Sequence, residues 1–273
     1  MSFEYTTPLD QETALTTSSD KRAMLGARGI TEDGRVFRYA QAGATDLVAY
    51  RIVCNPVESA YSTSTFVVSS AVYAAGTTYL LVGDPATASA VKNYFEDGWF
   101  FVNSTDVALH QVVQIDSHPA WASTTALGSA NYVNLKRPGL VKALATSSGM
   151  IKAIPSLYKS VIVMPGDPAS STLLQVPLGV PQTTVTATYY FWLQTYGPAL
   201  VLGDIGYASS NDLAGFKAVL ASGGTGAFNA LKLSGAVTGS DSGIEWHIPE
   251  IGWIMTANPA DTFFTMVFLT MAS

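Results

Sequence analysis

The chain has 273 residues, of which 48% are hydrophobic and only 12% are charged, about half the charged share usual in soluble domains. The net charge of −6 and the scatter of its basic residues exclude nucleic acid as the main partner, because phosphate binding needs clustered Lys and Arg. No apolar stretch approaches the about 20 residues of a membrane-spanning helix, so we expect no membrane partner. Cys54 is the one cysteine, which excludes an internal disulfide framework. The low charge favours a subunit that covers its surface with other protein and that assembles in the cytoplasm.

The chain begins with a polar, Thr- and Ser-rich stretch without periodicity, which predicts an extended N-terminal arm over residues 1–30 and no signal peptide. Beyond it, short runs of Val, Thr, Tyr, Phe and Ile separated by Gly and Pro predict an all-β fold. The predicted strands are Val36–Tyr39, Thr65–Ser69, Thr77–Val82, Trp99–Asn103, Val112–Ile115, Ser160–Met164, Thr186–Thr195, Ala199–Leu202 and Phe263–Leu269.

Two Asp-Gly pairs predict hairpins, because Asp-Gly supplies the positive φ that tight hairpin turns require. Asp33–Gly34 is the first pair, and Asp97–Gly98 lies at the centre of a predicted aromatic hairpin, Asn93–Val102. Helix is predicted only as short pieces within Pro85–Lys92 and Leu140–Ile151.

A domain boundary is predicted near residues 150–160, where Ser147–Gly149 and Pro155 interrupt the chain. The prediction is therefore two small barrel-like or sandwich-like β domains, residues 31–155 and 156–273.

The tetrapeptide Gly-Asp-Pro-Ala occurs twice, at Gly83–Ala86 and at Gly166–Ala169, each time after an apolar run. A duplicated domain would produce such a repeat. A shared turn would produce it too, because Asp-Pro turns are common.

The residues that usually carry catalysis form no recognisable constellation. His110, His118 and His247 lack the spacing of a metal site, so no metal and no cofactor are predicted. Ser240–Gly243 is similar to the Gly-Asp-Ser-Gly segment of trypsin-like serine proteases, but Ser stands in place of the leading Gly. Gly223–Gly226 lacks the Lys-Ser/Thr of a phosphate loop. The prediction is that the chain is not an enzyme and has no catalytic residues.

Paired carboxylates leave one exception open, because glycosidases need only two acids about 5–10 Å apart. Turn positions account for most of the candidates, since Asp favours turns beside Gly or Pro. The candidates are Asp84, Asp97, Asp116, Glu245 and Glu250.

Two patches of sequence resemble tailed-phage virion proteins, and in particular head decoration (cement) proteins. Leu25–Gly43 contains a Leu-Gly step, an Asp-Gly-Arg-x-Phe-x-Tyr-Ala run and then Ala-Gly, which resembles the start of such proteins. Gly76–Thr78 and Tyr94–Gly98 fit the same pattern. Near the other end, Tyr196–Leu202 resembles a strand that enters a small barrel, and Glu250–Leu269 resembles the ending of capsid decoration proteins.

The resemblance implies a β-tulip-like or barrel fold and a homotrimer that sits on the capsid surface of the virion and bridges major capsid subunits. The chain is about twice the length of small decoration proteins, which leaves the number of barrels and the shell position open. Rival functions are a tail, baseplate or fibre component and a host-glycan-binding module. A repeat period would favour the fibre, and none is visible.

Overall fold

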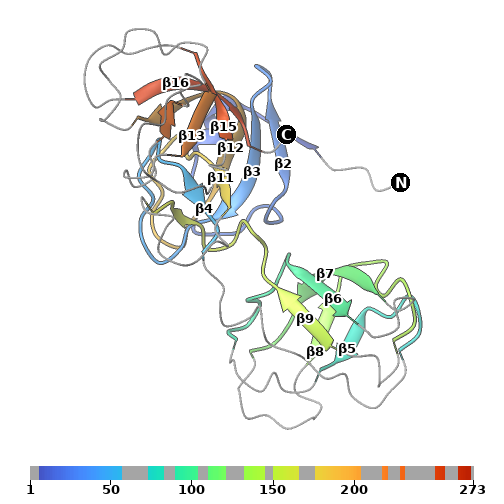
Figure 1. Cartoon of the computed structure of the whole chain (residues 1–273). Coiled ribbons are helices and arrows are strands. Elements are labelled where there is room, and N and C mark those ends of the chain that lie inside the picture. The colour runs from blue at the N-terminus through green and yellow to red at the C-terminus, as the bar shows by residue number, and fades with distance from the viewer. Residues whose placement is uncertain are drawn as a thin grey trace, which may run out of the picture. The chain divides into compact units, whose positions relative to one another are not determined.

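A computed structural model describes residues 6–56, 73–82, 90–103, 110–120, 132–144, 150–165, 176–203, 217–220, 228–230, 250–255 and 264–271. These residues form three antiparallel or mixed sheets and one short helix, α1 (Gln11–Leu15) (Figure 1). The predicted all-β fold is therefore confirmed as mostly β, but no closed barrel is detected in the described part of the chain. No helix within these ranges is long and apolar enough to cross a membrane.

The chain divides into two compact units. Unit 1 combines Met1–Val57 with Tyr158–Ser273, and unit 2 is Glu58–Leu157. The predicted domain of residues 31–155 therefore cuts across unit 1. The physical reason is backbone pairing, because β3 (Val36–Gln41) forms an antiparallel ladder with β12 (Tyr190–Leu202) far along the chain.

Unit 1 contains an eight-stranded sheet of order β1-β2-β3-β12-β16-β15-β13-β14 and a three-stranded sheet of order β10-β4-β11. The strands besides β3 and β12 are β1 (Thr6–Leu9), β2 (Arg28–Thr31), β16 (Phe264–Thr270), β15 (Glu250–Ile254), β13 (Lys217–Leu220), β14 (Phe228–Ala230), β10 (Ile162–Val163), β4 (Val53–Cys54) and β11 (Pro177–Gly179).

Strand β12 joins two predicted strands, Thr186–Thr195 and Ala199–Leu202, into one strand of 13 residues. Its first half pairs with β3 as far as Tyr196, and its second half pairs with β16 from Tyr196 to Leu202. Pro198 lacks a backbone N–H, which a central strand position does not tolerate. It is accommodated because it lies beyond the end of the β3 ladder, where β16 is the one described strand that pairs with β12.

The predicted extended arm is not what the structure contains over residues 6–31. Strand β1 pairs in parallel with β2, and Asp10 caps α1 by accepting a hydrogen bond of 2.6 Å from the Thr13 backbone N–H. Leu9 and Leu25 are buried in a cluster with Trp192 of β12. The polar composition concealed these few anchors, because they are not spaced with a regular period.

Unit 2 contains a five-stranded sheet of order β5-β8-β7-β6-β9. Its strands are β5 (Tyr79–Leu81), β8 (Tyr132–Leu135), β7 (Gln111–Ser117), β6 (Trp99–Asn103) and β9 (Met150–Ile154). One face of this sheet packs on a core that includes Leu80, Phe100, Ile115 and Val133, and the loop residue Phe95 is also fully buried there.

The two Asp-Gly predictions have opposite outcomes. Asp33–Gly34 turns the chain between β2 and β3, with Gly34 at φ 82°, and this hairpin is confirmed. The predicted hairpin Asn93–Val102 is wrong, because residues before Asp97 form turns and β6 pairs with β7 and β9 instead. Gly98 is needed for another reason: a Cβ there would collide with the carbonyl oxygen of Ile154.

The remaining predictions are mixed. Trp99–Asn103, Val112–Ile115 and Phe263–Leu269 correspond to β6, β7 and β16, whereas Ser160–Met164 retains only the two-residue β10. The described residues of Leu140–Ile151 contain no helix, because 141–142 form a bend, Leu144 makes an isolated bridge to Tyr73 and 150–151 belong to β9. Thr65–Ser69, the repeated Gly-Asp-Pro-Ala segments and residues 85–89 of Pro85–Lys92 lie outside the described residues.

The packing of the N-terminal segment is tested by truncating one of its anchors. We expect Leu9→Ala to lower the free energy of unfolding of unit 1 by about 2–5 kcal/mol, because Leu9 is 5% exposed and its loss leaves a cavity against Trp192. Leu15→Ala is the matched control, since Leu15 is 38% exposed. Denaturant unfolding followed by tryptophan fluorescence measures both; equal effects would contradict this packing.

Candidate binding surfaces

Two of the three histidines lie in the described residues: His110 is exposed directly before β7, and His118 is a buried structural residue. His118 is 2% exposed, and its Nε2 accepts a hydrogen bond of 2.9 Å from the Phe95 backbone N–H. Its Nδ1 lies 2.7 Å from the Pro119 carbonyl oxygen, so the neutral ring donates there and is fully used. His247, Ser240–Gly243 and Gly223–Gly226 lie outside the described residues. Within those residues, no group of three or more His, Cys, Asp or Glu could hold a metal.

Three of the five candidate acids lie in the described residues. Glu250 belongs to unit 1, whereas Asp97 and Asp116 belong to unit 2. The Asp97 side chain is 2% exposed, and its Oδ1 lies 2.6 Å from Lys136 Nζ in an ion pair. Asp116 is exposed on β7. Asp84 and Glu245 lie outside the described residues.

Cys54 lies in β4, fully buried in the core of unit 1. Burial disfavours the charged thiolate and raises the pKa of the thiol to about 12. A thiol of this kind is inert, since the thiolate is the reactive form.

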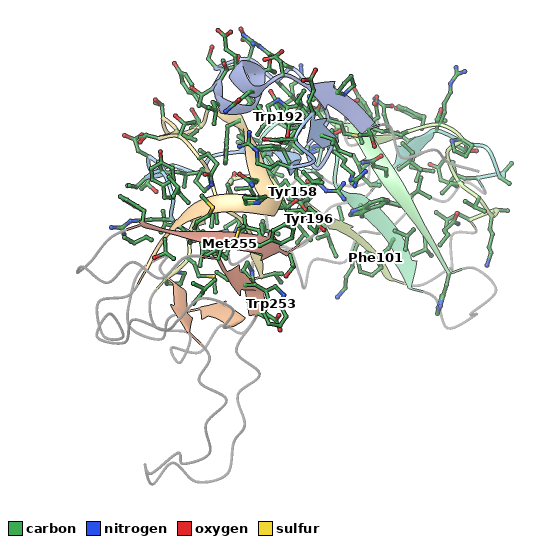
Figure 2. The ribbon with its side chains drawn as sticks, turned by 90° about the horizontal axis from the view of Figure 1, so that it is seen from above. Phe101, Tyr158, Trp192, Tyr196, Trp253 and Met255 are labelled. Atoms are coloured by element: carbon green, nitrogen blue, oxygen red, sulfur yellow. The ribbon has the colours of Figure 1, made fainter. Side chains whose placement is uncertain are left out.

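An exposed apolar surface covers the outer face of β12, β16 and β15 in unit 1. The register places Leu200 opposite Met266, and Phe268 opposite both Pro198 and Trp253. Residues directly opposite on neighbouring strands share a face. The surface consists of Tyr196, Pro198, Leu200, Trp253, Met255, Phe264, Met266 and Phe268, and we call it the β12–β16–β15 surface. Tyr196, Trp253 and Met255 are labelled on it in Figure 2.

The two halves of β12 differ in burial, and a register shift between Gln194 and Tyr196 separates them. Trp192, in the first half, is 8% exposed because it packs in one cluster with Leu9 and Leu25 of the N-terminal segment. Leu200, in the second half, is 39% exposed, and Trp253, on the far side of β16, is 44% exposed. The opposite face of the second half packs Ala199 and Val201 into a core. This part of the sheet is therefore apolar on both faces, and among the described residues a hydrophobic core covers only one of them.

Polar groups border the surface at Pro198. Pro198, Gln11, Asp33 and Arg35 line a cavity of about 310 Å³. Arg35 Nε donates to Asp33 Oδ2 at 2.8 Å. The Thr31 hydroxyl, which also donates to Asp33, and Arg35 hold the pKa of Asp33 below its ordinary value. An apolar centre with a polar rim is the usual anatomy of a protein–protein interface.

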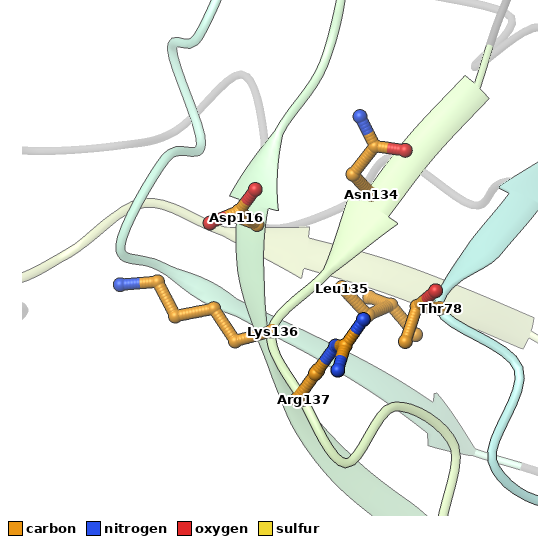
Figure 3. A pocket seen from close by; sticks show the side chains of 6 residues that line it. All are labelled: Thr78, Asp116, Asn134, Leu135, Lys136 and Arg137. Atoms are coloured by element: carbon orange, nitrogen blue, oxygen red, sulfur yellow. The ribbon is translucent and has the colours of Figure 1, made fainter.

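Unit 2 carries a second candidate, a polar pocket of about 480 Å³ (Figure 3). Asn134 of β8 and Asp116 of the neighbouring strand β7 both line this pocket. The residues that line the pocket are Thr78, Asp116, Asn134, Leu135, Lys136 and Arg137.

The sequence analysis missed both candidates. The available clue for the β12–β16–β15 surface is the run Phe264–Leu269, in which nearly every side chain is apolar rather than every second one. An antiparallel strand with one wet face alternates apolar and polar residues, so this run indicates a strand that is covered on both faces. The pocket has no such clue, because its residues come from three separate segments.

The burial of Cys54 predicts that its thiol does not react in the folded protein. We expect Ellman's reagent to release no thiol colour from the native chain at pH 8, where a thiol with a pKa of about 12 is almost wholly protonated. One equivalent should react after denaturation in guanidinium. Rapid labelling of the native chain would show that Cys54 is accessible.

The Asp97–Lys136 pair predicts a stability change in unit 2. Lys136→Met leaves the Asp97 carboxylate buried without its partner, which we expect to cost about 1–4 kcal/mol of unfolding free energy. Adding Asp97→Asn should recover part of the loss, because the amide carries no charge to bury. Lys142→Met, at an exposed lysine of the same unit, is the control. A loss no larger than that of the control would mean that the ion pair contributes nothing.

Two described surfaces can therefore bind a partner, one apolar and one polar. Comparisons of the chain with protein-family models, with curated proteins and with solved structures find no match. The function proposed for the chain rests on its own residues.

Proposed function

We propose that the chain is a non-enzymatic structural protein of a phage virion, which binds the outside of the capsid and stabilises it by bridging major capsid subunits. In this proposal the protein acts as a homotrimer. The observation that carries the binding role is the β12–β16–β15 surface, which exposes contiguous apolar side chains on a rigid sheet. Surfaces of this kind mark protein contacts, since monomeric soluble proteins seldom leave them open.

The composition of the surface supports protein as the occupant. Trp and Tyr at the centre of an apolar patch are the usual hot spots of interfaces. The Tyr196 and Phe268 rings meet edge to face at 5.1 Å, and Trp253 lies across from Phe268 in the ladder. The eight residues of the patch carry no charge, and charged residues lie at its border, where Lys217 of β13 pairs with Trp253 and Glu250 begins β15.

The assignment to a capsid is supported by the resemblance of Leu25–Gly43 and Glu250–Leu269 to decoration proteins. In unit 1 these segments include the β2–β3 hairpin and the pairing of β15 with β16. Residues 6–31 pack against β3 and β12 within unit 1, so in this proposal the copies join through the β12–β16–β15 surface rather than through a free arm. The capsid contacts of the three copies would then act together, and linked contacts raise avidity by about 10²–10⁴.

A tail, baseplate or fibre component is the alternative, because the same surface would serve assembly at any of these places. The copy number and position of the chain in an intact particle separate the two. Many copies spread over the head support decoration, and a few copies at the tail contradict it.

Self-association through this surface is tested with Trp253→Ser combined with Leu200→Ser. We expect the variant to sediment as a monomer at concentrations where the parent chain is a trimer. Loss of an aromatic hot spot costs about 2 kcal/mol or more, which is about thirtyfold in Kd.

The matched control is Trp99→Ser in unit 2, where Trp99 is 47% exposed, close to the 44% of Trp253. It should leave the trimer intact. A parent chain that sediments as a monomer at micromolar concentration would contradict the trimer. Unchanged capsid occupancy by the Trp253 variant would contradict the role of the surface.

A further inference from the structure

The polar pocket of unit 2 lies beside two tyrosines on the outward face of the sheet. In β5 and β8, Leu80 and Val133 point into the core, so Tyr79, Tyr132 and Asn134 point away from it. Tyr79 is 45% exposed and lies directly opposite Asn134 in the ladder. The rings of Tyr79 and Tyr132 lie 5.2 Å apart, so the two form one aromatic platform that adjoins the pocket.

Several polar groups of the pocket are available to a ligand. The Asn134 amide nitrogen donates to Ser117 Oγ at 2.9 Å, which fixes the side chain and leaves its oxygen to accept. Within the described part of the chain, Asp116 and Arg137 have no hydrogen-bond or ion-pair partner for their side chains. Lys136 is different, since its ammonium group is paired with Asp97.

The charges of the pocket discriminate between ligand classes. With Lys136 neutralised by Asp97, the remaining charges are one carboxylate and one guanidinium. A phosphate or a polyanion would meet the Asp116 carboxylate without a second free cation to balance it, and the chain as a whole carries −6. A neutral ligand meets no such repulsion.

A neutral sugar matches this arrangement of groups. A pyranose ring offers C–H groups on one face, which pack on an aromatic ring, and hydroxyls at its rim, which both donate and accept. A carboxylate and an amide oxygen accept from those hydroxyls, whereas a guanidinium donates to them. We propose that the pocket and the Tyr79–Tyr132 platform of unit 2 form a binding site for a neutral saccharide.

The site is separate from the β12–β16–β15 surface, because its residues all belong to unit 2. A chain that assembles through unit 1 would thus carry a sugar-binding site on unit 2. Many copies on one particle would multiply a weak affinity for a glycan-covered surface, since linked sites raise avidity.

The experiment screens the full-length chain on an array of neutral oligosaccharides, with uronate-containing oligosaccharides, heparin and single-stranded DNA on the same array. Saturation-transfer NMR with the best neutral oligosaccharide then measures the affinity. We expect binding to neutral oligosaccharides and none to heparin or DNA. No neutral oligosaccharide bound at millimolar concentration, or a preference for the polyanions, would overturn the proposal.

Substitutions at the pocket and at the tyrosine platform test whether the oligosaccharide binds at this site. Tyr79→Ala and Asp116→Ala should each weaken binding by about tenfold, which corresponds to the loss of one contact of about 1.4 kcal/mol. Tyr79→Phe should retain binding, because the ring is kept. Trp253→Ala, at an exposed aromatic of unit 1, is the matched control and should bind the oligosaccharide like the parent chain. If Tyr79→Ala and Trp253→Ala bind equally well, the site lies elsewhere.

Sedimentation of the same samples keeps the two proposals distinct. A Tyr79→Ala chain that remains a trimer and loses the oligosaccharide supports the saccharide site alone. A parent chain that binds the oligosaccharide but sediments as a monomer supports the saccharide site and contradicts the trimer.

Discussion

The backbone ladder along β12 is the constraint on which unit 1 depends. One edge of its first half is held by β3, and one edge of its second half by β16, so this strand joins the N-terminal and C-terminal parts of the chain. Its side chains enter two cores, Phe191 and Leu193 in one before the register shift between Gln194 and Tyr196, and Ala199 and Val201 in the other after it. Pro198, which cannot donate a backbone hydrogen bond, lies in the second half, beyond the end of the β3 ladder.

The two outward faces of the sheets differ in chemistry, and the difference follows from their strands. In β16 the outward positions are Phe264, Met266 and Phe268, so the face offers shape and apolar area without hydrogen-bond partners. In β7 and β8 the outward positions include Asp116 and Asn134, beside the exposed Tyr79 and the half-buried Tyr132. The first chemistry suits a protein surface that excludes water, and the second suits a small ligand with many hydroxyls.

The sequence predicts much of the β content and little of the connectivity. Strands of alternating or aromatic-rich residues, such as Trp99–Asn103, are local patterns, and local patterns were sufficient to find them. Pairing partners are not local, so the ladder between β3 and β12 could not be anticipated. The two Asp-Gly pairs illustrate the limit: Gly34 turns a hairpin, whereas Gly98 leaves room for the carbonyl of Ile154 on β9. The same dipeptide therefore serves a local purpose in one place and a long-range purpose in the other.

Unit 2 is inserted into unit 1 between the strands β4 and β10. Strand β4 ends shortly before unit 2 and β10 begins shortly after it, and the two strands pair directly, with Cys54 opposite Ile162 and Val53 opposite Val163. The entry and exit points are thus neighbouring strands of one small sheet. Topologically, unit 2 is a very long hairpin loop, and such loops are tolerated because closure entropy grows only slowly with length. A short turn could close the same gap, so unit 2 can vary, be exchanged or be lost as a separate module without unpairing β4 from β10.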